Sequence, residues 1–337
     1  MSRTILLSHG SGGQMSHDLI NDMFIRYFDN DVLNTQTDSA VLNIPPEHIS
    51  FTTDSYVIDP VFFPGGDIGK LAVCGTVNDL AVSGAVPKYL SAGFIIEEGF
   101  EYGKLERIVK SMAEEAKRAG VHIVTGDTKV VNRGKADKIF INTSGIGILN
   151  TKFKGLSYGK DITPGDKIIV NGTMGDHGVA IMAERENLGI NSHLESDCAS
   201  INHIIDLVLK SHNDVKLMRD ITRGGLATVL CEITDKDKFG IAIEEEHIPV
   251  KDQVNGICEI LGLDPLYIAN EGKFLMIAGE NEAEAILQTL KSDVLGRDAS
   301  IIGEVVDSAP GKVLLKTEIG GTRIVNMLAG EQLPRIC

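Results

Sequence analysis

Four aspartates stand where an apolar segment of this sequence meets a polar or glycine-containing turn. They are Asp38 in TQTDSAVLNI, Asp54 in FTTDSYV, Asp79 in GTVNDLAVSG and Asp127 in IVTGDTKVV. Such an aspartate is commonly a helix cap or a turn residue, and that interpretation stays open for each one. Asp79 fits it least, because a charge among small apolar residues is costly unless it is paired or metal-bound. Clustered carboxylates repel one another, so the four together predict an Mg²⁺ site.

Mg²⁺ on carboxylates usually also binds substrate phosphates, so the same residues predict a nucleoside triphosphate site. The metal would reverse the local field, which allows a polyanion to bind despite a formal net charge of −15. The segments GGDIGKL (65–71) and GLSYGKD (155–161) approach a phosphate-binding loop, but each is one residue too short and neither ends in Ser or Thr. The segment HGSGGQMSHDLI (9–20) has backbone N–H groups that could wrap phosphates, with a flexible arm as the alternative.

The last residue of the sequence is Cys337, in AGEQLPRIC. Chain ends are usually mobile and exposed, and an exposed thiol is open to oxidation, so this cysteine raises the question of a use for its sulfur. Arg335 would favour the thiolate, whereas the terminal carboxylate would oppose it. The other cysteines are far apart, with no CxxC or Cys/His cluster that would indicate zinc. We interpret them as core residues, namely Cys74, Cys198, Cys231 and Cys258.

Alternating strands and helices must position these groups. The apolar runs predict strands over 48–54, 87–99, 121–127, 137–149, 165–172, 239–246, 272–279 and 299–306. Helices are predicted over 68–84, 104–119, 175–189, 250–261 and 281–292, with a turn leading into another helix over 219–233. The segment 68–84 consists of small apolar residues and should be buried, whereas 104–119 has one apolar face. That face is formed by Leu105, Ile108, Val109, Met112, Ala116 and Ala119.

The pattern divides the chain into two α+β halves of similar size, joined near residues 150–165. A length of 337 residues also favours two domains, each large enough to bury its own core. We expect four parts, which are a flexible glycine-rich arm and helix (1–36), a first domain (37–152), a second α/β domain (153–330) and a mobile tail (331–337).

Composition excludes several classes of function. No run of Lys and Arg offsets the acidic charge, so nucleic-acid binding is disfavoured. No apolar stretch approaches the length of a membrane helix, and the N-terminus lacks the length and cleavage site of a signal peptide. The odd number of scattered cysteines is typical of a reduced, cytoplasmic protein.

Several of these segments together resemble a known superfamily. The motifs DSAVL, FTTDSYVIDPVFFPGGDIGKLAVCGTVNDLAVSGAVP, GDTKVV, DITRGGLA and NEGK are similar to those of the aminoimidazole-ribonucleotide synthetase (PurM-like) superfamily, which includes selenophosphate synthetase and thiamine-monophosphate kinase. Within it, LSHGSGGQM at the start and PRIC at the end resemble the HypE family of hydrogenase maturation factors. The resemblance covers essentially the whole chain.

The resemblance implies a homodimer of two-domain α+β subunits, α/β sandwich-like, that bind ATP and Mg²⁺ in a cleft of the first domain. Asp38, Asp54, Asp79 and Asp127 match the family's metal and phosphate ligands. The arm with His9, Gly10, Gly12 and Gly13 looks like the segment that closes over the nucleotide.

The resemblance also implies a reaction on Cys337. This cysteine would receive a carbamoyl group from the carbamoyltransferase HypF, and the protein would dehydrate the resulting thiocarbamate to a thiocyanate with ATP. The cyanide would then go to iron on the HypC–HypD complex. Glu271 is a candidate base, and Lys129 could neutralise phosphate or orient the amide, although a capping glutamate and a surface lysine are the alternatives.

Two other hypotheses about the function stay open. One is a superfamily kinase or synthetase acting on a free small molecule. The other is a non-catalytic thiol carrier or scaffold, which would not bind nucleotide with Mg²⁺.

Overall fold

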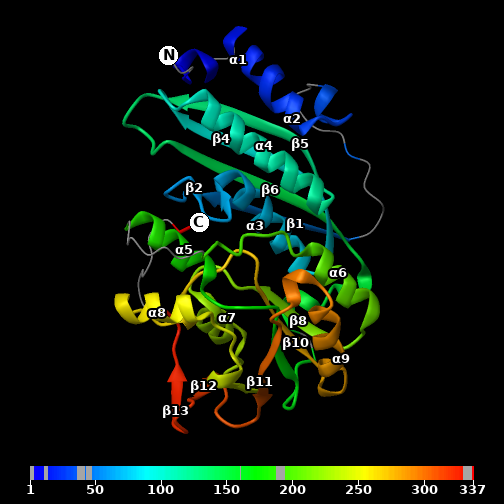
Figure 1. The fold of residues 1–337 in the computed structure, drawn as a ribbon. Coiled ribbons are helices and arrows are strands. Elements are labelled where there is room, and N and C mark those ends of the chain that lie inside the picture. The colour runs from blue at the N-terminus through cyan, green and yellow to red at the C-terminus, as the bar shows by residue number, and fades with distance from the viewer. Residues whose placement is uncertain are drawn as a thin grey trace.

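The computed structural model describes residues 4–10, 14–35, 42, 48–159, 161–186, 194–328 and 336–337. Figure 1 shows two α+β parts, one above the other, with the helix α3 (Ile68–Val82) between them. Each part is built on its own sheet, the first from strands before residue 150 and the second from strands after residue 166. The protein therefore has a two-domain α+β fold.

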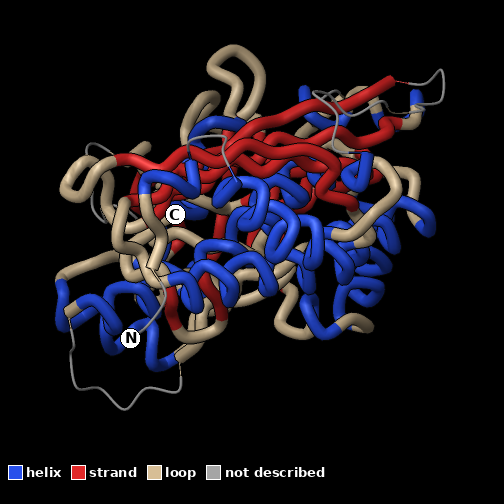
Figure 2. Tube along the Cα trace, turned by 90° about the horizontal axis from the view of Figure 1, so that it is seen from above, coloured by secondary structure: helices blue, strands red, loops and turns tan. Residues whose placement is uncertain are grey.

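The first domain contains a four-stranded sheet of β1 (His48–Tyr56), β4 (Ala85–Glu97), β5 (His122–Val131) and β6 (Ile139–Leu149). Their order is β1-β6-β4-β5, with β4 and β5 parallel and the other neighbours antiparallel. The helices α3 and α4 (Tyr102–Ala119) cover one face, and most helices lie on one side of the strands in Figure 2. The other face carries exposed Ile49, Phe51, Val86 and Ile95.

The two helices of this domain confirm the sequence-based prediction. Nearly every residue of α3 is buried, as small apolar residues at successive positions require. The Asp67 carboxylate caps its first turn by accepting bonds from the N–H groups of Gly69 and Lys70. In α4 all six residues of the predicted apolar face are buried.

The N-terminal segment forms a helical arm that packs on the first domain. It contains a short 3₁₀ turn (Leu7–Gly10), α1 (Gln14–Leu19), a π-helical segment (Ile20–Ile25) and α2 (Arg26–Phe28). Met23 and Phe24 are buried, and the ring of Phe24 lies 4.9 Å from that of Phe94 on β4. A small hairpin of β2 (Phe62–Phe63) and β3 (Gly66–Asp67) precedes α3.

The second domain is a seven-stranded sheet with helices on both faces. Its strands, in the order β13-β12-β9-β11-β7-β10-β8, are Thr322–Val325, Val313–Lys316, Gly240–Glu244, Ser300–Val306, Lys167–Val170, Phe274–Ala278 and Val215–Asp220. One core lies under α7 (Gly225–Ile233), and a second lies under α6 (Asn202–Ser211) and α9 (Glu280–Lys291). The helices α5 (Asp176–Arg185) and α8 (Asp252–Leu261) form a further cluster. Within the described residues, no helix combines the length and the apolar character that a membrane crossing requires.

The end of the chain does not lie on the surface. Ile336 and Cys337 are buried with the core of the first domain, which differs from the exposure expected of a terminal thiol. Residues 329–335, which include most of the predicted tail, lie outside the described residues, so the mobility of the tail stays a prediction.

The close approach of α3 to α4 gives a matched test. A Cβ at Gly69, the second residue of α3, would lie 2.4 Å from the backbone oxygen of Ile108, whereas a Cβ at Gly103, the second residue of α4, would meet nothing within 4 Å. We expect Gly69→Ala to lower the free energy of unfolding by about 1–3 kcal/mol through overpacking. Gly103→Ala should change it little or raise it by up to about 1 kcal/mol. Urea denaturation of the two variants measures this, and equal stabilities would contradict the packing described.

Candidate active site

Three carboxylates gather where the first sheet, α3 and the edge of the second sheet meet. Asp54 lies on β1 two residues after Thr52, whose hydroxyl donates to the Asp79 carboxylate of α3 at 2.7 Å. Asp220 ends β8, which contacts α3. The structure therefore brings Asp54 and Asp79 together, as predicted, and adds Asp220 to them.

The pKa values show how strongly these groups interact. Burial raises the pKa of Asp79, the hydrogen bond from Thr52 opposes that shift, and the charge of Asp54 raises it further. Burial and then the charge of Asp79 raise the pKa of Asp220 to about 7. The positive charges of Arg219 and Arg223 offset only part of this repulsion. Such a group of hard oxygen donors suits a divalent cation.

The carboxylate oxygens of the three aspartates do not all lie close enough together to surround a metal ion by themselves. Among the described residues, the one group of three whose ligand atoms all lie within 4.8 Å of one another is Glu244, Glu246 and His247 on the surface of the second domain. A cation held by Asp54, Asp79 and Asp220 would therefore keep some of its ligands as water, which is usual for Mg²⁺.

Cys337 lies beside this cluster. Its Sγ accepts a hydrogen bond from Nη1 of Arg223 at 3.4 Å, and an oxygen of its terminal carboxylate accepts one from the N–H of Val57, the residue after β1, at 3.1 Å. Burial raises the pKa of the thiol to about 12, with a further contribution from the charge of Glu271, while Arg223 acts in the opposite direction. In this position the sulfur is a protonated, uncharged thiol at neutral pH.

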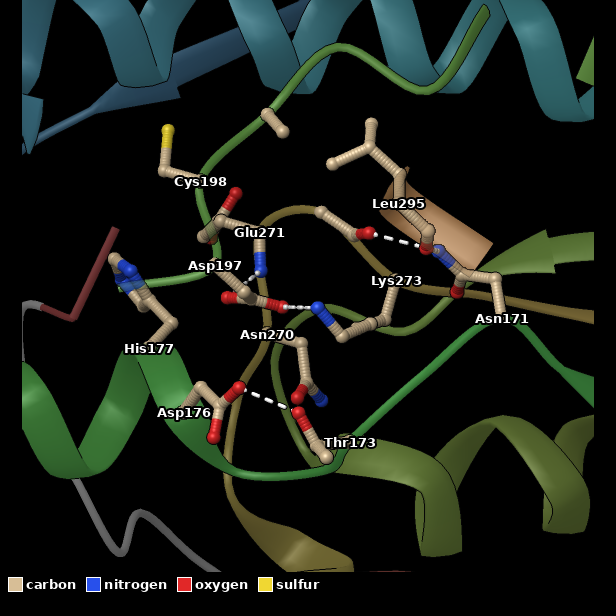
Figure 3. A network of polar contacts seen from close by, with 12 residues as sticks. Asn171, Thr173, Asp176, His177, Asp197, Cys198, Asn270, Glu271, Lys273 and Leu295 are labelled. Carbon is tan, nitrogen blue, oxygen red and sulfur yellow. Dashed lines mark hydrogen bonds and ion pairs between the residues drawn. The ribbon is translucent and has the colours of Figure 1, made fainter. Parts of the chain in front are cut away.

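Glu271 is a buried carboxyl group held by its backbone. Its N–H donates to Oδ1 of Asp197 at 3.0 Å, and its carbonyl oxygen accepts from Nδ2 of Asn78 at 3.3 Å. Asp197 is also paired with Lys273, at 3.2 Å (Figure 3). Burial raises the pKa of Glu271 well above its usual value, and nearby acidic groups raise it further. When ionised, such a carboxylate binds a proton more tightly than one in water, which is the property of a general base.

Asp127 and Lys129 lie apart from these residues within one chain. Asp54 pairs with Thr143, which pairs with Ala92, whereas Asp127 pairs with Gly93, the next residue on β4. Asp127 thus points to the opposite face of the sheet and lies on the opposite edge strand, about 14 Å away across three strand spacings. It forms an ion pair with Lys129 at 2.8 Å, and this hydrogen bond is the main reason that its pKa is lowered.

A cavity of about 230 Å³ lies next to this pair, between the N-terminal arm and β4–β5. Aromatic and aliphatic side chains line it, and Asp127, Lys129 and His9 complete its wall. His9 is buried, and its Nδ1 accepts the N–H of Leu6 at 3.0 Å. Of the other predicted site residues, Gly10 ends the 3₁₀ turn, while Asp38, Gly12 and Gly13 lie outside the described residues.

Sequence reasoning assigned no role to four residues of this region. Asp220 and Arg223 belong to the motif DITRGGLA, which was noted for its resemblance alone. His177 and Asp197 carried no signal that separates them from other polar residues. Three of the cysteines interpreted as core residues are buried, and Cys231 is partly exposed.

Protein-family models match both halves of the chain. The N-terminal domain model of AIR synthase related proteins matches residues 36–149, and the C-terminal domain model matches residues 163–316. The carbamoyl dehydratase HypE of Rhodobacter capsulatus is 49% identical over 335 residues, which are 99% of this chain and 98% of the relative.

Two solved structures are similar over nearly the whole chain. A crystal structure of the hydrogenase maturation protein HypE in complex with ATP has a TM-score of 0.94 and 48% identity, and covers 99% of this chain and 100% of that one. A HypE–HypF complex has a TM-score of 0.79 and 49% identity, and covers 92% of this chain and 99% of that one.

Both domain models and relatives of nearly half identity thus span the chain, and the buried terminal thiol lies beside the acidic cluster at the junction of the two domains. The chain belongs to the HypE family, within the AIR synthase related (PurM-like) superfamily.

Proposed function

We propose that this protein is a hydrogenase maturation dehydratase that converts a carbamoyl group on Cys337 into a thiocyanate with ATP, and so supplies cyanide for the iron of [NiFe]-hydrogenase. The observation that carries the proposal is the place of the Cys337 sulfur, which lies 3.4 Å from Arg223 and close enough to Glu271 for its charge to act on the thiol. The names of the relatives support the same reaction.

The reaction needs a leaving group, because a carbamoyl oxygen does not depart as hydroxide or oxide. Transfer of the ATP γ-phosphoryl group to that oxygen lets it leave as phosphate, and loss of the two N–H protons then gives S–C≡N and ADP. Glu271 is the residue that we assign to accept an N–H proton. Arg223 is placed to hold the sulfur end of the group while negative charge develops on the oxygen.

Asp54, Asp79 and Asp220 would hold Mg²⁺, which would neutralise phosphate charge and align the triphosphate. The relative crystallised with ATP supports a nucleotide site in this fold. The cavity beside Asp127 and Lys129 has apolar walls that suit a purine base, and Lys129 suits a phosphate.

Asp127 and Lys129 lie on the opposite edge strand and point to the opposite face of the sheet from Asp54, so we infer that the full site forms between two subunits. The uncovered face of the sheet carries Ile49, Phe51, Val86 and Ile95, and Phe51 is 66% exposed. Packing this face on a second copy would bury it. A two-fold axis parallel to the strands would set the β5 edge of one copy over the β1 edge of the other.

The tail has to leave its buried position to accept a carbamoyl group from another protein. A HypE–HypF complex is known for relatives, which supports HypF as the donor. Transfer onward to a HypC–HypD complex and a cytoplasmic location are parts of the same proposal.

The central test follows the mass of the C-terminal peptide in the presence of HypF, carbamoyl phosphate and ATP. We expect this peptide first to gain one carbamoyl group and then to lose one water when nucleotide is added. Cys337→Ala should abolish both changes, whereas Cys231→Ala, at a partly exposed thiol elsewhere in the second domain, should leave them intact. Formation of nitrile product by Cys337→Ala would refute the proposal.

The pH dependence of Mg²⁺ binding tests the acidic cluster. Asp220, with its pKa raised to about 7, is protonated at pH 6 and ionised at pH 8, and Mg²⁺ must displace its proton at the lower pH. The affinity for Mg²⁺ in the presence of ATP, measured by calorimetry, should therefore fall by about tenfold from pH 8 to pH 6.

Two variants serve as controls for this pH dependence. Asp220→Asn should bind Mg²⁺ weakly throughout and show a flatter pH profile, while Asp206→Asn, in an exposed pair with Lys210, should behave as the unchanged protein. An unchanged profile in Asp220→Asn would exclude Asp220 from the cation site.

Mixed dimers test the shared site. Lys129→Ala and Cys337→Ala should each be inactive, but a mixture that exchanges subunits should recover about a quarter of the activity, because half of the dimers are mixed and each keeps one intact site. As a control, Glu271→Ala mixed with Cys337→Ala should stay inactive, since one chain supplies both residues to a site. An inactive first mixture, with exchange shown by native mass spectrometry, would contradict a shared site.

A further inference from the structure

The last two residues occupy a buried site formed by Val57 of the first domain and by His177 and Arg223 of the second. We call this site the dock. Ile336 is buried, and its carbonyl oxygen accepts a hydrogen bond from Nε2 of His177, on α5, at 2.7 Å. The N–H of Val57, in the first domain, donates to an oxygen of the terminal carboxylate of Cys337. Figure 3 shows the end of the chain, in dark red, beside the His177 ring.

The protonation state of His177 follows from its partners. A carbonyl oxygen only accepts hydrogen bonds, so Nε2 carries a proton. The other ring nitrogen, Nδ1, lies 2.7 Å from the hydroxyl of Ser196, which in turn accepts the N–H of Cys198 at 3.1 Å. Because His177 is fully buried, its pKa is lowered and the ring is neutral. The Ser196 hydroxyl therefore donates to Nδ1, and this bond selects the tautomer that points N–H at Ile336.

These contacts fix the direction of the thiol. The bonds to the carbonyl oxygen of Ile336 and to the carboxylate oxygen of Cys337 lie on the two sides of the Cys337 Cα, so together they orient the bond from Cα to the thiol-bearing carbon. The ring of His177 is itself held at right angles to that of Phe63, with centroids 5.6 Å apart. The sulfur then lies against Arg223 without a direct contact from His177.

We infer that His177 is the positioning residue that docks the C-terminal dipeptide and aims Cys337 at the acidic cluster. It acts through the Ile336 backbone and does not touch the reacting sulfur. The role of the dock in dehydration rests on the proposed function, but the docking itself does not.

The segment that orients His177 also holds Glu271. Ser196 bonds to His177, and the next residue, Asp197, accepts the N–H of Glu271. One stretch of backbone thus sets the positions of both the docked tail and the proposed base.

Alkylation of Cys337 by iodoacetamide measures how often the tail leaves the dock, and it needs neither ATP nor a carbamoyl donor. The thiol reacts when the tail is undocked, so the rate follows the undocked population. Glutamine and asparagine form a matched pair at position 177, since the side-chain N–H of glutamine reaches the position of Nε2 and that of asparagine stays near Nδ1. Digestion and mass spectrometry follow Cys337 separately from the other four cysteines.

We expect His177→Asn to raise the alkylation rate of Cys337 by about fivefold, the effect of one lost hydrogen bond. His177→Gln should stay within about twofold of the unchanged protein. The rates at buried Cys74 and Cys258 should not change, which separates undocking from general loosening of the fold. Ser196→Ala removes the hydrogen bond that selects the His177 tautomer, so it should also increase the alkylation rate of Cys337. This variant replaces the His177 variants in the test if they do not fold.

Equal Cys337 rates in the unchanged protein and in the folded His177→Asn and Ser196→Ala variants would overturn the inference. So would a rise at Cys74 and Cys258 that matches the rise at Cys337, because His177 would then support the fold in general. Neither result bears on the dehydratase reaction, which the mass changes of the C-terminal peptide test separately.

Discussion

Burial of an uncharged sulfur between two domains is the constraint on which the site depends. Val57 comes from the first domain, and His177 and Arg223 come from the second, yet all three contact the last two residues of the chain. The position of Cys337 therefore exists only when the two domains are packed together. α3 makes that packing possible, because its small apolar residues let it lie against the first sheet while it also contacts α6 and β8 of the second domain.

The segment 194–201 shows how closely the domains are joined. It follows α5 in the second half of the sequence, but the N–H of Ser196 donates to Pro64 and the Asn78 side chain bonds to both Ala199 and Ile201. The same segment carries Asp197, which holds Glu271. Because its backbone polar groups are satisfied by the first domain, a movement between domains would displace the proposed base and the docked tail together.

Much of this fold could be predicted from periodicity, but the part that builds the dock could not. The strands that carry Asp54 and Asp127 and the buried helix that carries Asp79 have clear apolar patterns. β8 reads VKLMRD, which lacks strict alternation, so the strand that presents Asp220 gives no such signal. The sequence pattern also does not show whether two aspartates on different strands point to the same face of a sheet, because that depends on strand order and register. The clustering of Asp127 with the other acids is therefore not seen within one chain.

The charges around Cys337 decide which form of the tail fits the dock. Burial, Glu271 and Asp54 all disfavour a thiolate, and Arg223 offsets only part of that effect. A thiolate is the form that attacks a donor, so under the proposed function the buried position would be unsuited to loading of the sulfur. A carbamoylated sulfur carries no charge and enters the same surroundings without that electrostatic cost. Its added amide can also make hydrogen bonds that a thiol makes poorly. Under the proposed function, the acidic pocket would separate the two steps by charge: the sulfur would be activated outside the pocket, where water and the donor can reach it, and would return once the carbamoyl group has made it neutral.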